Sequence, residues 1–226
     1  MQIKAILFDI DGTLIDSNDF HVLAWEEAFT EIGAQFDRQA LHDQIGKGAD
    51  MLVPTLLPDL PKDAQENLGK VQGRIFKAKY RSDAKPFGSA HDLLAHAHAL
   101  GQHVVLASSA SAADLAHYLD VLDATELVSA TTSSDDVERT KPGPDIFVTA
   151  LAKLPGIAAS EVLVVGDTPY DVEAARKCGI AAVALRSGRF SDEVLSGAGA
   201  IAIYDDAAAL LADYANSPLG GRTEVI

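Results

Sequence analysis

The chain has 226 residues, of which 48% are hydrophobic and 23% charged, a composition typical of one large globular domain or of a core domain with an insertion. Its 33 acidic residues outnumber the 18 Lys and Arg, and the formal net charge of −15 argues against nucleic acid or an anionic membrane surface as a partner. No apolar run approaches the roughly 18 residues of a membrane span. The single cysteine, Cys178, excludes an internal disulfide, and the first residues turn acidic too soon for a secretory signal. We therefore expect a cytoplasmic protein that is monomeric or weakly dimeric.

Short aliphatic runs recur along the chain and predict the strands of a buried parallel sheet. The first covers residues 3–8, and the others cover residues 104–107, 127–130, 162–165, 181–185 and 200–203. Amphipathic segments typical of helices lie between them, at residues 88–100, 111–119, 144–154, 170–178 and 206–214. This alternation predicts an α/β fold whose core is a doubly wound, Rossmann-like parallel sheet. Active sites of such sheets lie at the carboxyl ends of the strands.

Residues 17–81 interrupt the alternation with helical periodicity alone, in segments covering residues 20–32, 38–45, 49–57 and 64–80. We therefore expect an all-helical cap domain, residues 17–81, inserted into an α/β core domain that comprises residues 1–16 and 82–226. If the insertion is a separate lid, its hinges fall at residues 15–17 and 82–86. The polar, glycine-rich tail, residues 216–226, is expected to be frayed.

The loop after the first strand carries Asp9 and Asp11, followed by Gly12 and Thr13. Two carboxylates this close repel each other unless a cation or a shared proton compensates their charge. Gly12 permits a sharp turn that a side chain would obstruct. The alternative is an ordinary Asp-Gly turn with a solvated carboxylate.

Three further motifs follow later strands. Ser108 and Ser109 open a helix, where hydroxyls and free N–H groups can bind an oxyanion, although serine is also a common helix cap. Lys141 stands before a Pro-Gly-Pro loop that holds it in place to neutralise an anion, unless it is an ordinary solvated lysine. Asp167 ends a strand, and Asp171 follows one helical turn later, which is also the pattern of a helix cap.

The carboxylates of these motifs are hard oxygen ligands. Asp9, Asp11 and Asp167 suit Mg²⁺, which takes few carboxylates and keeps several water ligands.

Taken together and in this order, the motifs resemble the haloacid dehalogenase superfamily in its Mg²⁺-dependent phosphotransferase branch. The match spans the whole core, in Asp9-x-Asp11-Gly12-Thr13, Ser108, Lys141 and Gly166-Asp167-x-x-x-Asp171. The insertion resembles the helical cap of that family. Within it, the stretches His21-x-x-Ala24-Trp25 and Gly46-Lys47-Gly48 are similar to the β-phosphoglucomutase-like group.

The resemblance implies a phosphatase that hydrolyses a small-molecule phosphate monoester. It makes Asp9 the nucleophile that forms an aspartyl-phosphate, and Asp11 the general acid and then the general base. Ser108 would hold the transferred phosphoryl group with help from the backbone of Ser109 and Gly12. Lys141 would neutralise charge on the nucleophile and the phosphate.

The resemblance also implies Mg²⁺ as cofactor. The ion would bind the Asp9 carboxylate, the main-chain carbonyl of Asp11 and the carboxylate of Asp167, while Asp171 and Thr13 support these ligands from behind.

Two other functions stay open. The fourth motif has Gly166 where mutases of this superfamily usually carry Glu, which favours a phosphatase over a phosphomutase of the β-phosphoglucomutase type. Dehalogenases and phosphonate hydrolases of the superfamily lack an aspartate at the position of Asp11. A non-catalytic, phosphate-binding regulator on the same fold is the third possibility, and the complete set of catalytic residues disfavours it.

Two residues of the insertion are candidates for substrate contact. Lys47 could bind a distal anionic group of the substrate, and His21 could reach the cleft. The alternatives are a solvated lysine and a histidine packed within a helix.

Overall fold

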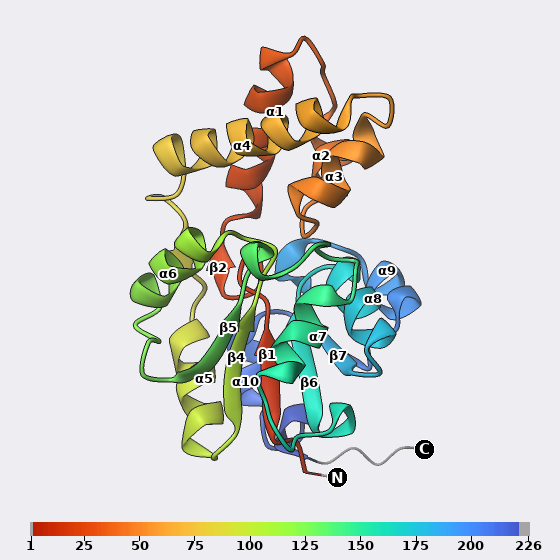
Figure 1. The fold of residues 1–226 in the computed structure, drawn as a ribbon. Coiled ribbons are helices and arrows are strands. Elements are labelled where there is room, and N and C mark those ends of the chain that lie inside the picture. Colours follow the sequence, from red (N-terminus) through yellow and green to blue (C-terminus); the bar gives the residue numbers. More distant parts are fainter. Residues whose placement is uncertain (1, 222–226) are drawn as a thin grey trace.

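A six-stranded sheet forms the centre of the molecule in a computed structural model that describes residues 2–221 (Figure 1). The strand order is β5-β4-β1-β6-β7-β8, and every neighbouring pair is parallel. The strands are β1 (Ala5–Phe8), β4 (His103–Ala107), β5 (Val128–Thr132), β6 (Val162–Gly166), β7 (Ala181–Leu185) and β8 (Ala202–Tyr204). The predicted doubly wound α/β fold is confirmed, because all six expected strands form close to their expected bounds.

Helices cover both faces of this sheet. Successive residues of β1 point to opposite faces, so that Ile6 and Phe8 join one apolar cluster and Leu7 joins the other. The first cluster is covered by α5 (Ala90–Ala99), α6 (Ala112–Val121) and α10 (Ala207–Ala212). The second is covered by α7 (Asp145–Ala152), α8 (Pro169–Lys177) and α9 (Asp192–Ala198). Helix α9 was not predicted, because its seven residues include serine and glycine, which are weak helix formers.

Four helices lie beyond the carboxyl end of the sheet, at the top of Figure 1. They are α1 (Asn18–Glu31), α2 (Arg38–His42), α3 (Ala49–Leu56) and α4 (Lys62–Lys79). Helix α1 packs on α2 and α4, and α3 packs on α4. Trp25, Phe29 and Phe76 are buried among them, as amphipathic helices require.

Two short strands connect these helices to the rest of the chain. β2 (Ile15–Asp16) and β3 (Lys85–Pro86) pair antiparallel, at the positions where hinges were expected. The pairing itself was not predicted, because a strand of two residues carries no alternating pattern.

The end of the described chain is packed against the core, which corrects the expectation of a frayed tail over residues 216–221. Ser217 and Leu219 are buried, and the side-chain amide of Gln102 donates to the Leu219 carbonyl at 2.9 Å. Residues 222–226 of that expected tail lie outside the described residues. Short 3-10 turns complete the fold: η1 (Ser134–Asp136), η2 (Ala159–Glu161), η3 (Arg186–Gly188) and η4 (Pro218–Gly220). No helix within residues 2–221 has both the length and the apolar character needed to cross a membrane.

Candidate active site

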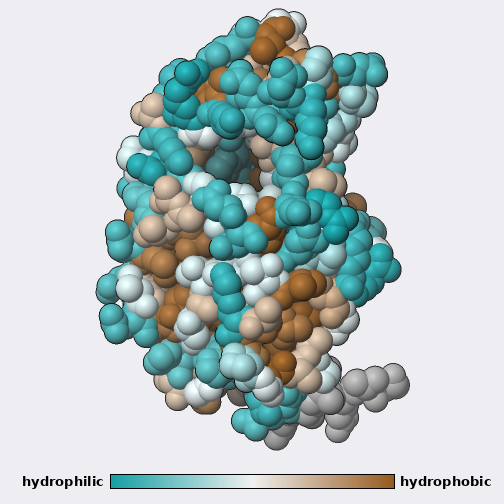
Figure 2. All heavy atoms as spheres, viewed as in Figure 1, coloured by the Kyte–Doolittle hydropathy of each residue, from teal (hydrophilic) through white to brown (hydrophobic). Residues whose placement is uncertain are grey.

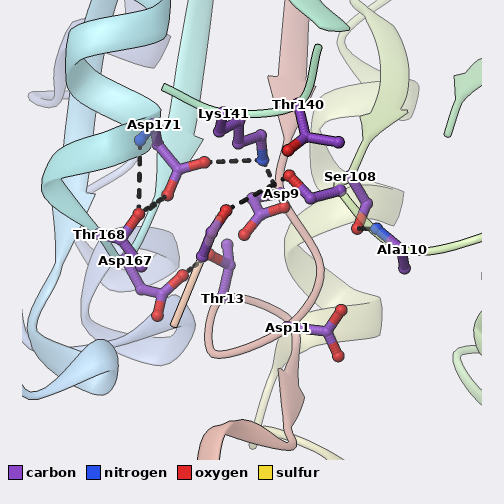
Figure 3. Close-up of polar contacts among 12 residues, drawn as sticks. Asp9, Asp11, Thr13, Ser108, Ala110, Thr140, Lys141, Asp167, Thr168 and Asp171 are labelled. Carbon is purple, nitrogen blue, oxygen red and sulfur yellow. Dashed lines mark hydrogen bonds and ion pairs between the residues drawn. The ribbon is translucent and has the colours of Figure 1, made fainter. Parts of the chain in front are cut away.

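The predicted catalytic side chains converge at the carboxyl ends of three adjacent strands (Figure 3). Asp9 follows β1, Ser108 follows β4 and Asp167 follows β6. Because these strands are neighbours in the sheet, their ends bring residues far apart in the sequence together. Lys141 enters from the loop between β5 and α7, and Asp171 enters from the first turn of α8.

Lys141 lies at the centre of this group and is fully buried. Its Nζ is 2.5 Å from Oδ1 of Asp9 and 2.7 Å from Oδ1 of Asp171. Burial by itself would lower the pKa of Lys141, but the negative charges of Asp171 and Asp9 outweigh burial and raise that pKa. The amine therefore stays positively charged between the two carboxylates.

Three buried carboxylates face this single cation. Asp9, Asp167 and Asp171 each offer one oxygen, and these oxygens lie within 4.8 Å of one another. Burial raises the pKa of Asp9 to about 7 in spite of Lys141. Burial, together with the charges of Asp171 and Asp9, also raises the pKa of Asp167. When all three are ionised, three negative charges and one positive charge leave two negative charges uncompensated, and hard oxygen donors with that surplus fit a divalent cation such as Mg²⁺.

Hydrogen bonds behind the cluster fix the orientation of Asp167 and Asp171. Asp167 accepts from the Thr13 hydroxyl at 2.8 Å and from the Asn18 amide at 2.9 Å. Asp171 accepts from the hydroxyl of Thr168 at 2.7 Å and from its backbone N–H at 3.1 Å, which also caps α8. Asn18 was not predicted as a site residue, because only the fold brings the start of α1 to β6.

The Asp11 side chain points away from this cluster (Figure 3). Its Oδ1 accepts from the Ser17 hydroxyl at 2.6 Å and lies 3.1 Å from Nε2 of His21. Burial acts to raise the pKa of Asp11, but the charge of His21 and the hydrogen bonds from His21 and Ser17 lower it. His21 is itself held by Gln72, 3.3 Å from Nδ1, and by stacking on Phe76. A histidine of the helical insertion thus reaches the predicted acid–base residue.

The predicted phosphate-binding groups differ in whether their hydrogen-bond donors are already used within the protein. Ser108 is buried and its Oγ accepts a loop N–H at 3.0 Å, so its hydroxyl proton stays available to donate. The Ser109 hydroxyl donates to the Gly46 carbonyl of the insertion at 3.3 Å. The Gly12 N–H donates to the Ile15 carbonyl at 2.8 Å. Gly12 also has φ +78°, and a Cβ there would collide with the Asp167 side chain, so glycine is required for this close approach.

A cleft of about 1070 Å³ separates the insertion from the sheet, and Figure 2 shows the molecule hollowed there. Asp9, Asp11 and Ser108 line it on the core side, opposite His21 and Lys47 on the insertion side. The cleft is therefore lined by three of the four predicted catalytic residues and by both predicted substrate contacts of the insertion.

Lys47 lies in the cleft without a carboxylate partner among the described residues. Its Nζ donates to the Gln44 side chain at 2.6 Å and lies 4.6 Å from the centre of the Tyr170 ring. Partial burial lowers its pKa. A half-buried, unneutralised cation at this position can pair with an anionic part of a ligand.

The family model of haloacid dehalogenase-like hydrolases matches residues 6–185, which include every one of these catalytic motifs. The chain belongs to this family. It is also 28% identical to phosphoglycolate phosphatase of Rhodospirillum rubrum, over 96% of this chain and 93% of that protein. The family and the phosphatase activity predicted from the motifs are therefore confirmed.

Solved structures share the fold of this family member. A hydrolase from Pseudomonas syringae superposes with a TM-score of 0.88 at 27% identity, over 94% of this chain and 98% of that chain. A candidate β-phosphoglucomutase from Bacteroides vulgatus superposes with a TM-score of 0.83 at 21% identity, over 94% and 88% of the two chains. The second likeness shows the fold alone.

Proposed function

We propose that the protein hydrolyses a small-molecule phosphate monoester with the help of Mg²⁺, through an aspartyl-phosphate formed on Asp9. The observation that carries this proposal is the contact between buried Asp9 and Lys141 at the floor of the cleft, 2.5 Å apart. A carboxylate nucleophile needs a cation beside it when it attacks a phosphate, because both reactants are negatively charged.

In this proposal Mg²⁺ is held by the carboxylates of Asp9 and Asp167 and by the main-chain carbonyl of Asp11. When bound, the ion neutralises negative charge on the nucleophile and on the transferred phosphoryl group. Asp171 forms an ion pair with Lys141, and it therefore acts on the site by holding the lysine amine in position.

The reaction proceeds in two displacements at phosphorus. An Asp9 oxygen attacks, the bond from phosphorus to the ester oxygen breaks, and protonated Asp11 delivers its proton to the departing oxygen. Water then attacks the aspartyl-phosphate and loses a proton to Asp11, which releases inorganic phosphate and regenerates Asp9. Throughout, Lys141 keeps its positive charge beside Asp9, and the Ser108 hydroxyl donates to the phosphoryl oxygens.

In the structure Asp11 is bonded to Ser17 and His21, and these contacts lower its pKa and favour the ionised carboxylate. The ionised form is the base that accepts a proton from water in the second step, and the protonated form is the acid of the first step.

We further propose that residues 17–81 act as a cap that closes over the core domain, residues 1–16 and 82–226, about the β2–β3 pair. Closure excludes water from the cleft and brings Lys47 to the part of the substrate beyond the reacting phosphate. Esters with a second anionic group suit this arrangement. Phosphoglycolate, for which the Rhodospirillum rubrum relative is named, carries such a group in its carboxylate.

Release of phosphate from a small aryl phosphate tests this function. We expect turnover with Mg²⁺ and none after treatment with a chelator, restored by added Mg²⁺. Binding of inorganic phosphate without turnover at any Mg²⁺ concentration would instead indicate a phosphate-binding regulator.

The same assay has an expected pH dependence. Because burial raises the pKa of Asp9 to about 7 and also raises that of Asp167, protons compete with Mg²⁺ for these oxygens at low pH. The Mg²⁺ concentration that gives half-maximal activity should therefore fall from pH 6 to pH 8. The same requirement at both pH values would contradict the assignment of these two carboxylates as ligands.

The substitution Lys47→Ala should lower kcat/KM for a substrate with a second anionic group and leave kcat/KM for a small aryl phosphate almost unchanged. The core holds the reacting phosphate, so the cap contacts only what lies beyond it. We expect kcat/KM to fall about tenfold or more on phosphoglycolate alone, which is the loss of one charged hydrogen bond. Lys153→Ala removes an exposed lysine outside the cleft and is the control. Equal losses on both substrates, or none on either, would exclude this role for Lys47.

A further inference from the structure

Residues 46–50, which comprise the end of a loop and the first two residues of α3, contact three of the loops that carry the catalytic groups. The Ser109 hydroxyl donates to the Gly46 carbonyl at 3.3 Å. Gly46 also lies against Thr168 so closely that a Cβ would meet its side chain at 2.7 Å. The third contact is with Thr140, which directly precedes Lys141. The insertion therefore meets the core where the phosphate site is assembled.

The third contact is a network of three hydrogen bonds. Asp50 accepts through Oδ1 from the Thr140 hydroxyl at 2.5 Å, and through Oδ2 from the Thr140 backbone N–H at 2.9 Å. The Thr140 hydroxyl in turn accepts from the Gly48 N–H at 2.9 Å. Thr140 is buried, and its hydroxyl uses its single donor and one acceptor position in these bonds. Bonds to an ionised carboxylate are stronger than those between neutral groups.

These bonds hold the backbone beside the catalytic lysine. The Thr140 carbonyl accepts from the Gly143 N–H at 2.8 Å, which closes the turn that contains Lys141. Asp50 thus holds one end of this turn from the insertion side, while Asp9 and Asp171 hold the lysine amine from the core side. A displacement of Thr140 would carry the Lys141 backbone with it.

We propose that Asp50 is a positioning residue, which sets Lys141 for phosphoryl transfer when the insertion is seated on the core. This inference rests on the proposed function, because it concerns the placement of the lysine in that reaction. It also gives the insertion a second task, since Asp50 acts on the reacting end of every substrate and Lys47 only on the distal end.

Two ion pairs between the insertion and the core involve core residues outside the catalytic loops. Arg189 pairs with Asp19 at 2.8 Å, and Lys77 pairs with Asp114 at 3.3 Å. The first pair is largely exposed, and exposed ion pairs contribute little to stability. The Asp50–Thr140 bonds are partly buried and adjoin a catalytic residue, so their loss should act on the reaction more than on folding.

Kinetics of four variants on a small aryl phosphate test this proposal. Asp50→Ala removes both bonds from Thr140 to the carboxylate, whereas Thr140→Val removes the two bonds of the hydroxyl and keeps that of the backbone N–H. Misplacement of a catalytic group by about 1 Å can cost up to about 10²-fold. We expect each to lower kcat about 10- to 10²-fold with a smaller change in KM. The loss in the double variant should be smaller than the product of the two single losses, because both variants remove the bond between the Thr140 hydroxyl and Asp50. Thr140→Ser keeps the hydroxyl and the N–H and should restore kcat.

The matched control is Asp63→Ala. Asp63 also lies in the first turn of an insertion helix, α4, but it is exposed and forms no ion pair or side-chain hydrogen bond among the described residues. Its loss should leave kcat unchanged. Thermal unfolding of every variant shows whether a loss of kcat reflects a loss of folded protein. A wild-type kcat in Asp50→Ala, or a double variant whose loss is the product of the two single losses, would overturn the proposal.

Hydrogen exchange separates this proposal from the proposed function, because it needs no activity. The Thr140 amide donates to Asp50, so it should exchange faster in Asp50→Ala and remain protected in Asp63→Ala. Unchanged protection in Asp50→Ala would overturn the positioning role even if the wild-type protein hydrolyses phosphate esters. An inactive wild-type protein would refute the proposed function and, with it, the positioning role, whatever the exchange result.

Discussion

The substitution Asp9→Asn is expected to abolish phosphatase activity while the protein stays folded. The amide keeps the shape of the side chain but is a poor nucleophile, so no aspartyl-phosphate can form. Phosphate release from an aryl phosphate in the presence of Mg²⁺ measures the effect. If Asp9→Asn kept a tenth of the wild-type activity, the covalent mechanism would be wrong.

Folding of this variant follows from the charges of the site. In the wild-type protein Asp9, Asp167 and Asp171 lie close together, and Lys141 pairs with Asp9 and Asp171. Burial raises the pKa of Asp9. Because the pKa of Asp9 is raised in the folded protein, ionisation of Asp9 lowers the free energy of unfolding. This loss develops as the pH rises from the ordinary pKa of an aspartate towards about 7. Asp9→Asn removes that ionisation and leaves Lys141 paired with Asp171. Without Mg²⁺ at neutral pH, its Tm should therefore be no lower than that of the wild-type protein.

The substitution Asp11→Asn is expected to slow hydrolysis by about 10²–10⁴-fold, the usual contribution of a positioned general acid–base. Asparagine can neither protonate the departing oxygen nor take a proton from water. The loss should be smaller on an ester whose leaving group is a weakly basic phenolate, because such a group departs with little need of a proton. Comparison of kcat on aryl phosphates with leaving groups of different pKa measures this effect. An equal loss on all of them would place the role of Asp11 outside proton transfer in the first step.

Binding of Mg²⁺ to the same variant separates the proton-transfer role from the metal-binding role. The Asp11 side chain points away from the carboxylate cluster, so Asp11→Asn should largely preserve Mg²⁺ affinity. Asp167→Asn removes a proposed ligand and should reduce that affinity strongly. Calorimetric titration with Mg²⁺ compares the two variants, and an equal loss of affinity would contradict the division of roles.

The strands and the types of residue proposed for catalysis could be predicted from the sequence, because both depend on short stretches of chain. A run such as residues 162–165 is typical of a buried strand, and Asp167 follows it after one glycine. Parallel strands bring their carboxyl ends to one edge of the sheet, so motifs after different strands must meet. The sequence therefore predicts that Asp9, Ser108 and Asp167 lie close together.

Very short elements and the directions of side chains could not be predicted from the sequence. The β2–β3 pair is too short for an alternating pattern, and helix α9 contains serine and glycine, which are weak helix formers. The tail up to residue 221 packs through Leu219 although its sequence is polar. The spacing of Asp9 and Asp11 indicated two nearby carboxylates. It did not indicate that Asp11 turns towards Ser17 and His21.

The sequence alone therefore indicates the α/β core, the helical insertion and the types of residue at the strand ends. The partners of those residues depend on the tertiary structure. Asn18 and Asp167 are 149 residues apart, and Asp50 and Thr140 are 90 apart, yet each pair is joined by hydrogen bonds. A local sequence pattern predicts which residues share a face of one helix or strand. Contacts between residues far apart in the sequence depend on how whole elements pack. The position of the insertion over the sheet is a result of that packing, and it brings His21, Lys47 and Asp50 to the site.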